Sequence, residues 1–155
     1  MKLVIAAACG LLALSCLMSG AARAGTRPEG TWVSEDGGLK VRLSDCGRNR
    51  LCATVVWLGE PNDPATGKPK TDKHNPDPAK RGRPLIGLHV AGLKPSGPNR
   101  WSGLIYNADD GHTYRVQLLV QDSSTVRLQG CVLHVLCRGH TWTRISVVAR
   151  NMAAH

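Results

Sequence analysis

The chain has 155 residues, with 20 lysines and arginines against 11 acidic residues, and a formal net charge of +9. That length supports one domain with a sizeable core, and no second domain boundary is visible. Aromatic residues are few and phenylalanine is absent. Stacking platforms for bases are therefore scarce, and the positive charge alone does not predict nucleic-acid binding.

Residues 1–24 have the pattern of an export signal, and residues 25–155 would form the mature domain. A positively charged start is followed by an apolar run from Leu3 to Ser19 and by the small residues of Ala22-Arg23-Ala24. The run is about the minimum length for a membrane span, so an anchor is an alternative, and Cys16 allows a lipoprotein. Cleavage after Ala24 predicts a periplasmic or secreted protein of 131 residues with net charge +7 and no remaining transmembrane span.

The mature sequence is typical of an all-β protein. Apolar and polar residues alternate with a period of two in several short segments, and no segment keeps a helical period. Asp110-Gly111 is a two-residue hairpin signal. The first expected strand opens at residue 30, and the others cover residues 39–44, 51–58, 85–93, 101–106, 114–120, 125–129 and 141–148.

Seven or eight short strands with hairpin turns predict a β-sandwich or an antiparallel up-and-down barrel. Two motifs favour the barrel: Gly30-Thr31-Trp32 on the first strand and Trp142-Thr143-Arg144 on the last. They resemble the lipocalin-like (calycin) signature, in which an arginine of the last strand covers a tryptophan of the first. The resemblance implies structural roles for Trp32, Trp142 and Arg144, with the Arg144 guanidinium stacked on Trp32 at the closed end.

Four cysteines remain after cleavage, and an even number in an exported chain predicts two disulfides. The turn-like residues 47–50 would bring Cys46 and Cys52 together, so we expect the pairs Cys46–Cys52 and Cys131–Cys137. A long-range pair such as Cys46–Cys131 is the alternative, since it would constrain the unfolded chain more. Zinc is the weaker interpretation, because the repeated C-x5-C spacing is longer than usual for zinc ligands, and we assign no metal.

The segment 61–85, PNDPATGKPKTDKHNPDPAKRGRPL, is the strongest candidate for function. It holds six of the nine prolines, and a loop of this length is usually functional or disordered. Its Pro, Asp, Asn and Thr residues set local turns, so we expect it to be ordered. Its cations could bind an anion, its carboxylates could bind a cation, or the loop could satisfy its own polar groups. The candidate ligand-binding residues are Asp63, Thr66, Lys68, Asp72, Asn75, Asp77, Arg81 and Arg83, of which Asp72 and Arg83 are expected to position the loop as a gate.

The chain carries several short sequence blocks, three in this segment and three outside it. They are Asp63-Pro64, Thr66-Gly67-Lys68-Pro69, Asn75-Pro76-Asp77-Pro78, Val56-Trp57-Leu58, Trp101-Ser102-Gly103 and Gly130-Cys131-Val132-Leu133. Together they resemble a family of small exported bacterial proteins, domain of unknown function 2147. The resemblance covers nearly the whole mature chain. It implies an exported lipocalin-like barrel, and it brings no established activity and no catalytic residues.

The function expected from these features is binding. No catalytic motif is present, so the chain is not expected to be an enzyme, and no cofactor is predicted. A small closed barrel either is filled by side chains or holds one small ligand. The leading hypothesis is a module for a small amphipathic or anionic ligand in the cell envelope. The alternatives are a filled barrel that contacts anionic envelope components through its basic surface, and an enzyme with polar residues in the mouth. Residues that could line the interior are Trp57, Trp101, Leu104, Tyr114 and Leu118.

Overall fold

The computed structural model describes residues 27–132 and 136–145, without the side chains of residues 131–137. The predicted signal peptide over residues 1–24 lies outside the described residues. No helix in the described ranges is long and apolar enough to cross a membrane. The elements are β1 (Gly30–Ser34), β2 (Leu39–Asp45), β3 (Leu51–Leu58), the 3-10 helix η1 (Pro78–Lys80), β4 (His89–Gly97), β5 (Arg100–Asn107), β6 (His112–Val120), β7 (Thr125–Val132) and β8 (Leu136–Arg144).

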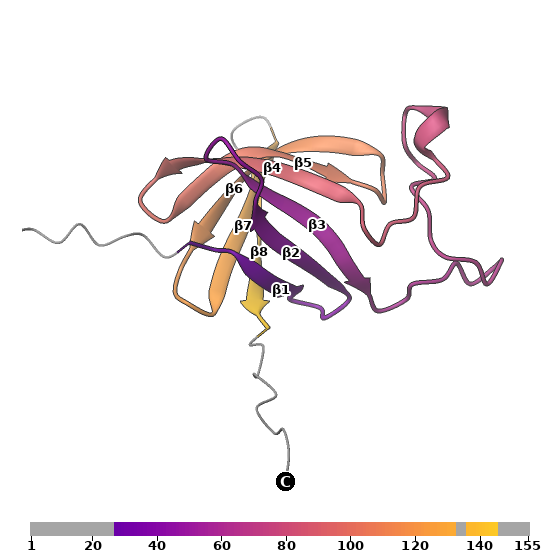
Figure 1. The fold of residues 1–155 in the computed structure, drawn as a ribbon, viewed down its shortest axis with the longest axis horizontal. Coiled ribbons are helices and arrows are strands. Elements are labelled where there is room, and N and C mark those ends of the chain that lie inside the picture. The colour runs from indigo at the N-terminus through magenta and orange to yellow at the C-terminus, as the bar shows by residue number, and fades with distance from the viewer. Residues whose placement is uncertain (1–26, 133–135, 146–155) are drawn as a thin grey trace, which may run out of the picture.

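The eight strands form one closed antiparallel barrel (Figure 1). Each strand pairs with the next along the chain, and β8 returns to pair with β1, where Trp32 lies opposite Arg144. Closure gives each of the eight strands a hydrogen-bonded neighbour on both sides. The predicted all-β up-and-down barrel is confirmed.

The inner face of the barrel carries the apolar core, because successive side chains of a strand point to opposite faces of the sheet. Trp32 is completely buried, and it packs with inward residues from β2 to β7. The buried cluster comprises Trp32, Val41, Leu43, Leu51, Ala53, Leu93, Val116, Leu118, Val120 and Val126.

The two ends of the barrel differ. At one end, β1 begins beside the β2–β3, β4–β5 and β6–β7 turns; we call this the closed end. At the other, the open end, a long loop of residues 59–88 joins β3 to β4. Figure 1 shows this long loop projecting beyond the ends of the two strands. The strand β8 pairs with β1 only over residues 142–144, so its first half extends past β1 at the open end.

Two strands differ from their predicted bounds. The strand expected over 85–93 begins at His89, because residues 85–88 complete the long loop. The strand expected over 141–148 runs from Leu136 to Arg144 instead, and residues 146–148 are outside the described residues. Its first residues include Arg138 and His140 and lack the apolar alternation on which the prediction depended.

The disulfide between Cys46 and Cys52 is formed, with a Cα–Cα distance of 5.8 Å. It closes the tight turn between β2 and β3, where Arg48 and Asn49 both have positive φ angles. On the β7–β8 hairpin the backbone register places Cys131 directly opposite Cys137. Their side chains lie outside the described part, so this second disulfide stays a prediction.

Candidate functional site

The closed end is sealed by Trp32 and Arg144. The indole Nε1 of Trp32 donates a hydrogen bond of 2.8 Å to the carbonyl oxygen of Pro28. The Arg144 guanidinium lies over the ring at 4.3 Å and donates to the carbonyl oxygens of Glu29 and Ser123. A planar cation with several donors can stack on an indole and satisfy backbone carbonyls at once. The expected stacking of Arg144 on Trp32 is confirmed, and it covers the indole at this end.

The first part of the long loop is a set of self-contained turns. The Asp63 carboxylate accepts hydrogen bonds from the backbone N–H groups of Ala65 and Thr66, and the Thr66 hydroxyl accepts from Lys68 N. A bridge between Asn62 and Pro69 closes this turn. Asp63, Thr66 and the backbone of Lys68 therefore bond within the loop, as in the alternative of a loop that satisfies its own polar groups.

The centre of the long loop is a buried polar cluster around Asp72, whose exposed fraction is 0%. Its carboxylate accepts from the Tyr106 hydroxyl at 2.5 Å, from Asn75 Nδ2 at 2.8 Å and from Arg83 Nη2 at 2.8 Å. Asn75 is also buried, and its backbone carbonyl oxygen accepts from Arg81 Nε at 2.8 Å. A buried carboxylate is tolerated only when it is paired and fully hydrogen-bonded, and this one is.

These contacts set the ionisation of the cluster. Burial alone would raise the pKa of Asp72, but hydrogen bonds from Tyr106, Arg83 and Asn75 outweigh it and hold that pKa below its usual value. Burial and the neighbouring Asp72 carboxylate raise the pKa of the Tyr106 phenol. The cluster is therefore an ionised carboxylate held by neutral and cationic donors at neutral pH.

The cluster fixes the long loop to the outside of the barrel. Ile105 packs into the core, so Tyr106, the next residue on β5, points outward. The hydroxyl of Tyr106 reaches Asp72 from the outer face of the sheet. His74 lies against the tip of the β5–β6 hairpin at Gly111. The long loop is thus anchored beside the open end, on the β5–β6 side.

We expect Gly111→Ala to detach this part of the loop. Gly111 has φ +74°, and a Cβ there would lie 2.0 Å from the carbonyl oxygen of His74. Both the left-handed backbone and the contact resist a side chain, so the hairpin or the loop must move. Hydrogen exchange of residues 70–76 should become faster. The control is Gly82→Ala, whose Cβ would meet no atom within 4 Å; equal exchange in the two variants would contradict the contact.

The remaining predicted residues of the loop have local partners. The Asp77 side chain caps η1 through Ala79 N and pairs with Lys80 at 2.9 Å. Arg83 and Asp72, expected to act as a gate, are brought together by a 2.8 Å ion pair. A hollow of about 350 Å³ lies beside this pair, lined by Arg83, Pro84, Ile86, Gly87, Leu88 and His89.

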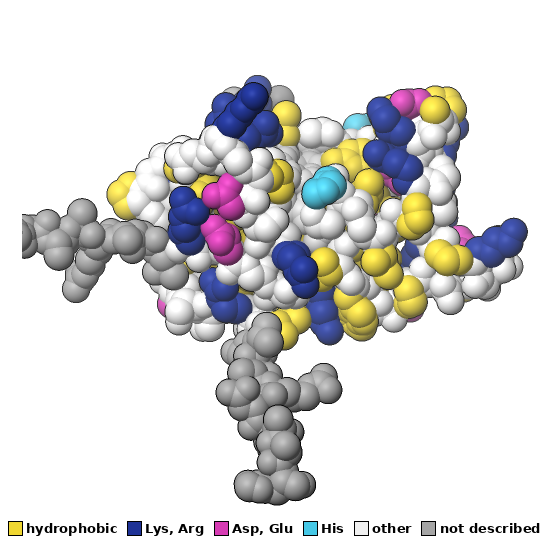
Figure 2. Space-filling model, in the orientation of Figure 1, with side chains coloured by type: hydrophobic (Ala, Val, Ile, Leu, Met, Phe, Trp, Pro, Cys, Tyr) yellow, Lys and Arg dark blue, Asp and Glu magenta, His cyan; other side chains and the backbone are white. Residues whose placement is uncertain are grey.

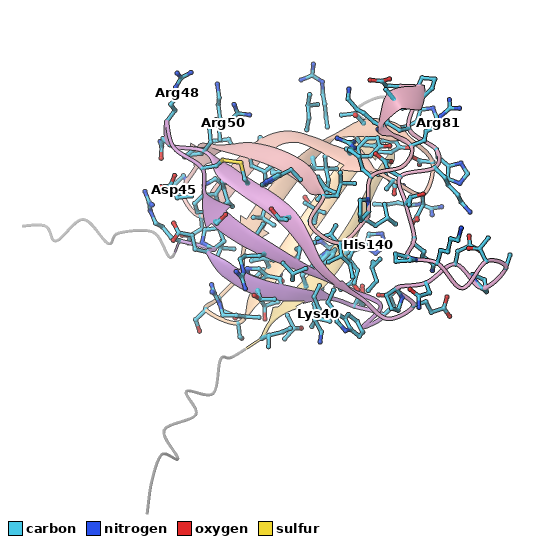
Figure 3. All side chains as sticks on the ribbon, turned by 45° about the vertical axis from the view of Figure 1, so that its right-hand side comes forward. Lys40, Asp45, Arg48, Arg50, Arg81 and His140 are labelled. Carbon is cyan, nitrogen blue, oxygen red and sulfur yellow. A yellow bond between two sulfur atoms is a disulfide. The ribbon has the colours of Figure 1, made fainter. Side chains whose placement is uncertain are left out.

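A set of polar residues lines the inner face at the open end. Tyr114 was expected to line the interior, whereas Arg138 and His140 were not predicted from the sequence. Tyr114 lies opposite Ile105, Arg138 opposite Gly130, and His140 opposite Leu128, all in inward-facing register. Tyr114 nevertheless keeps 37% exposure, and Arg138 and His140 are also exposed. Figure 3 shows His140 on the side of the barrel toward the long loop, away from Asp45 and Arg48 at the closed end. We call Tyr114, Arg138 and His140 the mouth residues.

The surroundings of the mouth residues provide both charge and hydrogen-bonding groups. The Tyr114 hydroxyl donates to Asp110 at 2.7 Å. On the opposite side, hydrogen bonds from the Ser34 hydroxyl and Gly38 N lower the pKa of Asp36, with a small contribution from nearby His140. Deeper on β8, Trp142 packs against the core, and its Nε1 has no hydrogen-bond partner among the described residues. The open end therefore combines an apolar wall with the Arg138 cation, the carboxylates of Asp36 and Asp110, and hydrogen-bonding groups.

Two residues considered for the interior point outward. Trp57 lies opposite Lys40, whose Nζ is 4.1 Å from the ring centroid, and it is 39% exposed. A bulge in β3 at Val56 shifts the register by one residue and turns Trp57 to the other face. Leu104 is 51% exposed and lies opposite Arg115 on the outer face. The prediction that either lines the interior is wrong.

Comparison with known proteins gives a fold and a family. Protein HP1028 from Helicobacter pylori, described as belonging to the lipocalin family, superposes with a TM-score of 0.66 and 22% identity, over 79% of this chain and 85% of that chain. A redesigned β-barrel aligns with a TM-score of 0.43 and 11% identity, over 76% of this chain and 90% of the other. No curated protein matches this chain significantly in sequence. The family model for uncharacterised proteins conserved in bacteria (DUF2147) matches residues 30–144, and the chain therefore belongs to the DUF2147 family, with a lipocalin-like barrel.

Proposed function

We propose that this protein binds a small amphipathic ligand with an anionic head group, in the cell envelope, through the open end of its barrel. The observation that carries the proposal is the exposure of three residues on the inner face, Tyr114, Arg138 and His140. In a barrel filled by its own side chains, inward residues would be covered. Here they are covered at the closed end and accessible at the open end.

The inner face near the mouth residues is built from small side chains. Ala91 and Gly103 face inward on β4 and β5, and Gly130 faces inward on β7 next to Arg138. The space at Gly103 is filled by Gly92 and Leu93 of β4, whereas a Cβ at Gly130 would make only ordinary contacts. Gly130 therefore leaves room for the apolar part of a ligand beside Leu128. The guanidinium of Arg138 can then hold a carboxylate, phosphate or sulfonate, because it presents several donors in one plane.

Both ends of the barrel support entry of the ligand through the open end. Trp32 and Arg144 close the far end, so a ligand would enter beside the long loop. The loop is anchored to the outer wall through Asp72 and Tyr106, which leaves it next to the mouth. The gating role expected for Asp72 and Arg83 stays a prediction.

The test uses the mature protein, purified from periplasm with its disulfides intact, and 8-anilinonaphthalene-1-sulfonate, an amphipathic anion, as the fluorescent probe. Arg138→Gln should weaken probe binding about tenfold, the value of one charge-assisted hydrogen bond. Gly130→Leu should abolish binding by filling the interior, since a Cβ at Gly130 makes only ordinary contacts. The matched control is Arg127→Gln on the neighbouring strand, whose side chain lies on the outer face.

The outcomes separate the alternatives clearly. Loss of binding in both mouth variants, with unchanged melting temperatures and normal binding by Arg127→Gln, supports a site inside the mouth. Full binding by Gly130→Leu would show that the probe does not enter the barrel, and the proposal would then be abandoned. Native mass spectrometry of the same preparation would reveal a co-purified ligand as a mass excess lost on denaturation.

A further inference from the structure

A second surface, on the outside of the barrel, collects positive charge. Strands β4–β7 carry exposed cations at outward positions, and Arg50 from the β2–β3 turn lies over the same wall. We call the five residues Arg50, Lys94, Arg100, Arg115 and Arg127 the cationic wall. None of them takes part in the mouth or in the long loop.

Negative charge is kept away from this wall. All eleven acidic residues of the chain lie in turns, in the long loop or at the ends of strands. Throughout the described residues, no member of the cationic wall has a carboxylate within 4.0 Å. In Figure 2, the group of Lys and Arg side chains at the upper left edge of the view has no acidic side chain among it, whereas the group at the upper right, on the long loop, adjoins one. The wall therefore presents uncompensated charge to a partner.

Two arginines of the cationic wall lie directly over glycines of the sheet. Arg50 lies so close over Gly92 that a Cβ there would be 2.6 Å from its Nη2. Arg127 lies over Gly139 in the same way, with Nε at 2.8 Å from the position of a Cβ. A guanidinium that rests flat on the sheet loses less side-chain freedom when it binds a partner.

An apolar residue lies in the middle of these charges. Leu104 is 51% exposed and stands between Gly92, which carries Arg50, and Arg115 on the next strand. Neighbouring strands are about 4.8 Å apart, so the two arginines flank the leucine within roughly 10 Å. The partner must therefore accept several cations and one apolar side chain on a broad convex surface.

We infer that the cationic wall docks on a lipid bilayer that contains anionic phospholipids. Phosphate groups would receive the arginines and Lys94, while Leu104 would enter the interfacial region. A nucleic acid is a poorer fit, because the outer face of β4–β7 in the described structure offers it no free aromatic ring: Tyr106 is held by Asp72, and Tyr114 faces inward. This inference goes beyond the proposed ligand site and does not depend on it.

The experiment is co-sedimentation of the mature protein with vesicles of phosphatidylglycerol and phosphatidylcholine, and with phosphatidylcholine vesicles alone. Binding is expected only with the anionic lipid and should weaken steeply from 50 to 500 mM salt, because the Debye length shrinks. The double variant Arg50→Gln/Arg115→Gln should bind about 25-fold more weakly, or about fivefold for each cation removed. Leu104→Ser should weaken the binding that persists at high salt.

The matched control is Lys68→Gln/Lys73→Gln in the long loop, which removes the same net charge elsewhere on the surface. The inference requires this control to bind nearly as well as the unmodified protein. Equal weakening in the two double variants would mean that only net charge matters, and it would overturn a defined docking face. Three other outcomes would also overturn the inference: binding to vesicles that does not change with salt, no binding to vesicles, and binding to an acidic polysaccharide in place of vesicles. Probe binding at the mouth should be unchanged in the wall variant, and vesicle binding unchanged in Arg138→Gln.

Discussion

Trp32→Ala is expected to lower the free energy of unfolding by about 3–5 kcal/mol, the usual range for a large buried aromatic residue. Trp32 is completely buried, its Nε1 bonds to Pro28, and its ring supports the guanidinium of Arg144. The substitution would leave a cavity at the closed end and remove the surface on which Arg144 lies. Denaturation by urea, followed by circular dichroism, would measure the loss.

The matched control for this prediction is Trp57→Ala. Trp57 is on the outer face and 39% exposed, and its main partner is the Lys40 ammonium. Loss of that cation–π contact should cost roughly 0.5–1 kcal/mol. If the two tryptophan variants lost similar free energies of unfolding, the burial of Trp32 would not make the closed end more important for stability than the outer face.

Asp72→Asn is expected to release the long loop while the barrel stays folded. The substitution removes the charge that Arg83 contacts and places an N–H donor in a cluster that already has three donors. Leaving buried groups unpaired costs about 2–3 kcal/mol, so hydrogen exchange in residues 70–84 should become roughly 30- to 150-fold faster. The control is Asp77→Asn in the same loop, at an exposed cap, where little change is expected. Slow exchange in Asp72→Asn would show that packing, and not the carboxylate, holds the loop.

Acid should release the loop in the same way. Because the pKa of Asp72 is held below its ordinary value, its contribution is complete above that value, about 4, and is lost as the pH falls through the lower folded pKa. For Tyr106 the sign is opposite. Its pKa is raised, so its contribution is present below about 10 and is lost at higher pH. Protection factors of the loop, which correct for the pH dependence of intrinsic amide exchange, should therefore be highest between these limits. A flat protection profile in the acid range would contradict the assigned ionisation of Asp72.

Local patterns predicted much of the barrel correctly. The strand expected over residues 51–58 matches β3, because its apolar residues and its length are characteristic by themselves. The pair Cys46–Cys52 followed from a short turn between two strands. The contact of Arg144 with Trp32 joins residues more than 100 positions apart, and only the resemblance to the lipocalin-like signature made it predictable.

Two of the mouth residues, Arg138 and His140, were missed for a physical reason. Arg138 and His140 occupy inward positions of β8, where the apolar alternation used to recognise a strand is broken. The strand was therefore expected to start at residue 141. A polar residue on the inner face breaks the apolar alternation of a strand, and functional sites often break such local rules. The wrongly predicted start of β8 therefore pointed to the candidate site at the mouth.

The sequence by itself determined most of the strand content, the turns and the presence of an ordered, polar long loop, because these depend on neighbouring residues. Only the tertiary structure decided which face each side chain occupies and what the loop touches. One bulge at Val56 turned Trp57 outward, and the parity of β5 placed Tyr106 on the outer wall to bind Asp72. A shift of one residue reverses every side chain that follows it, and the alternation pattern of a single strand does not record where its partner strand makes that shift.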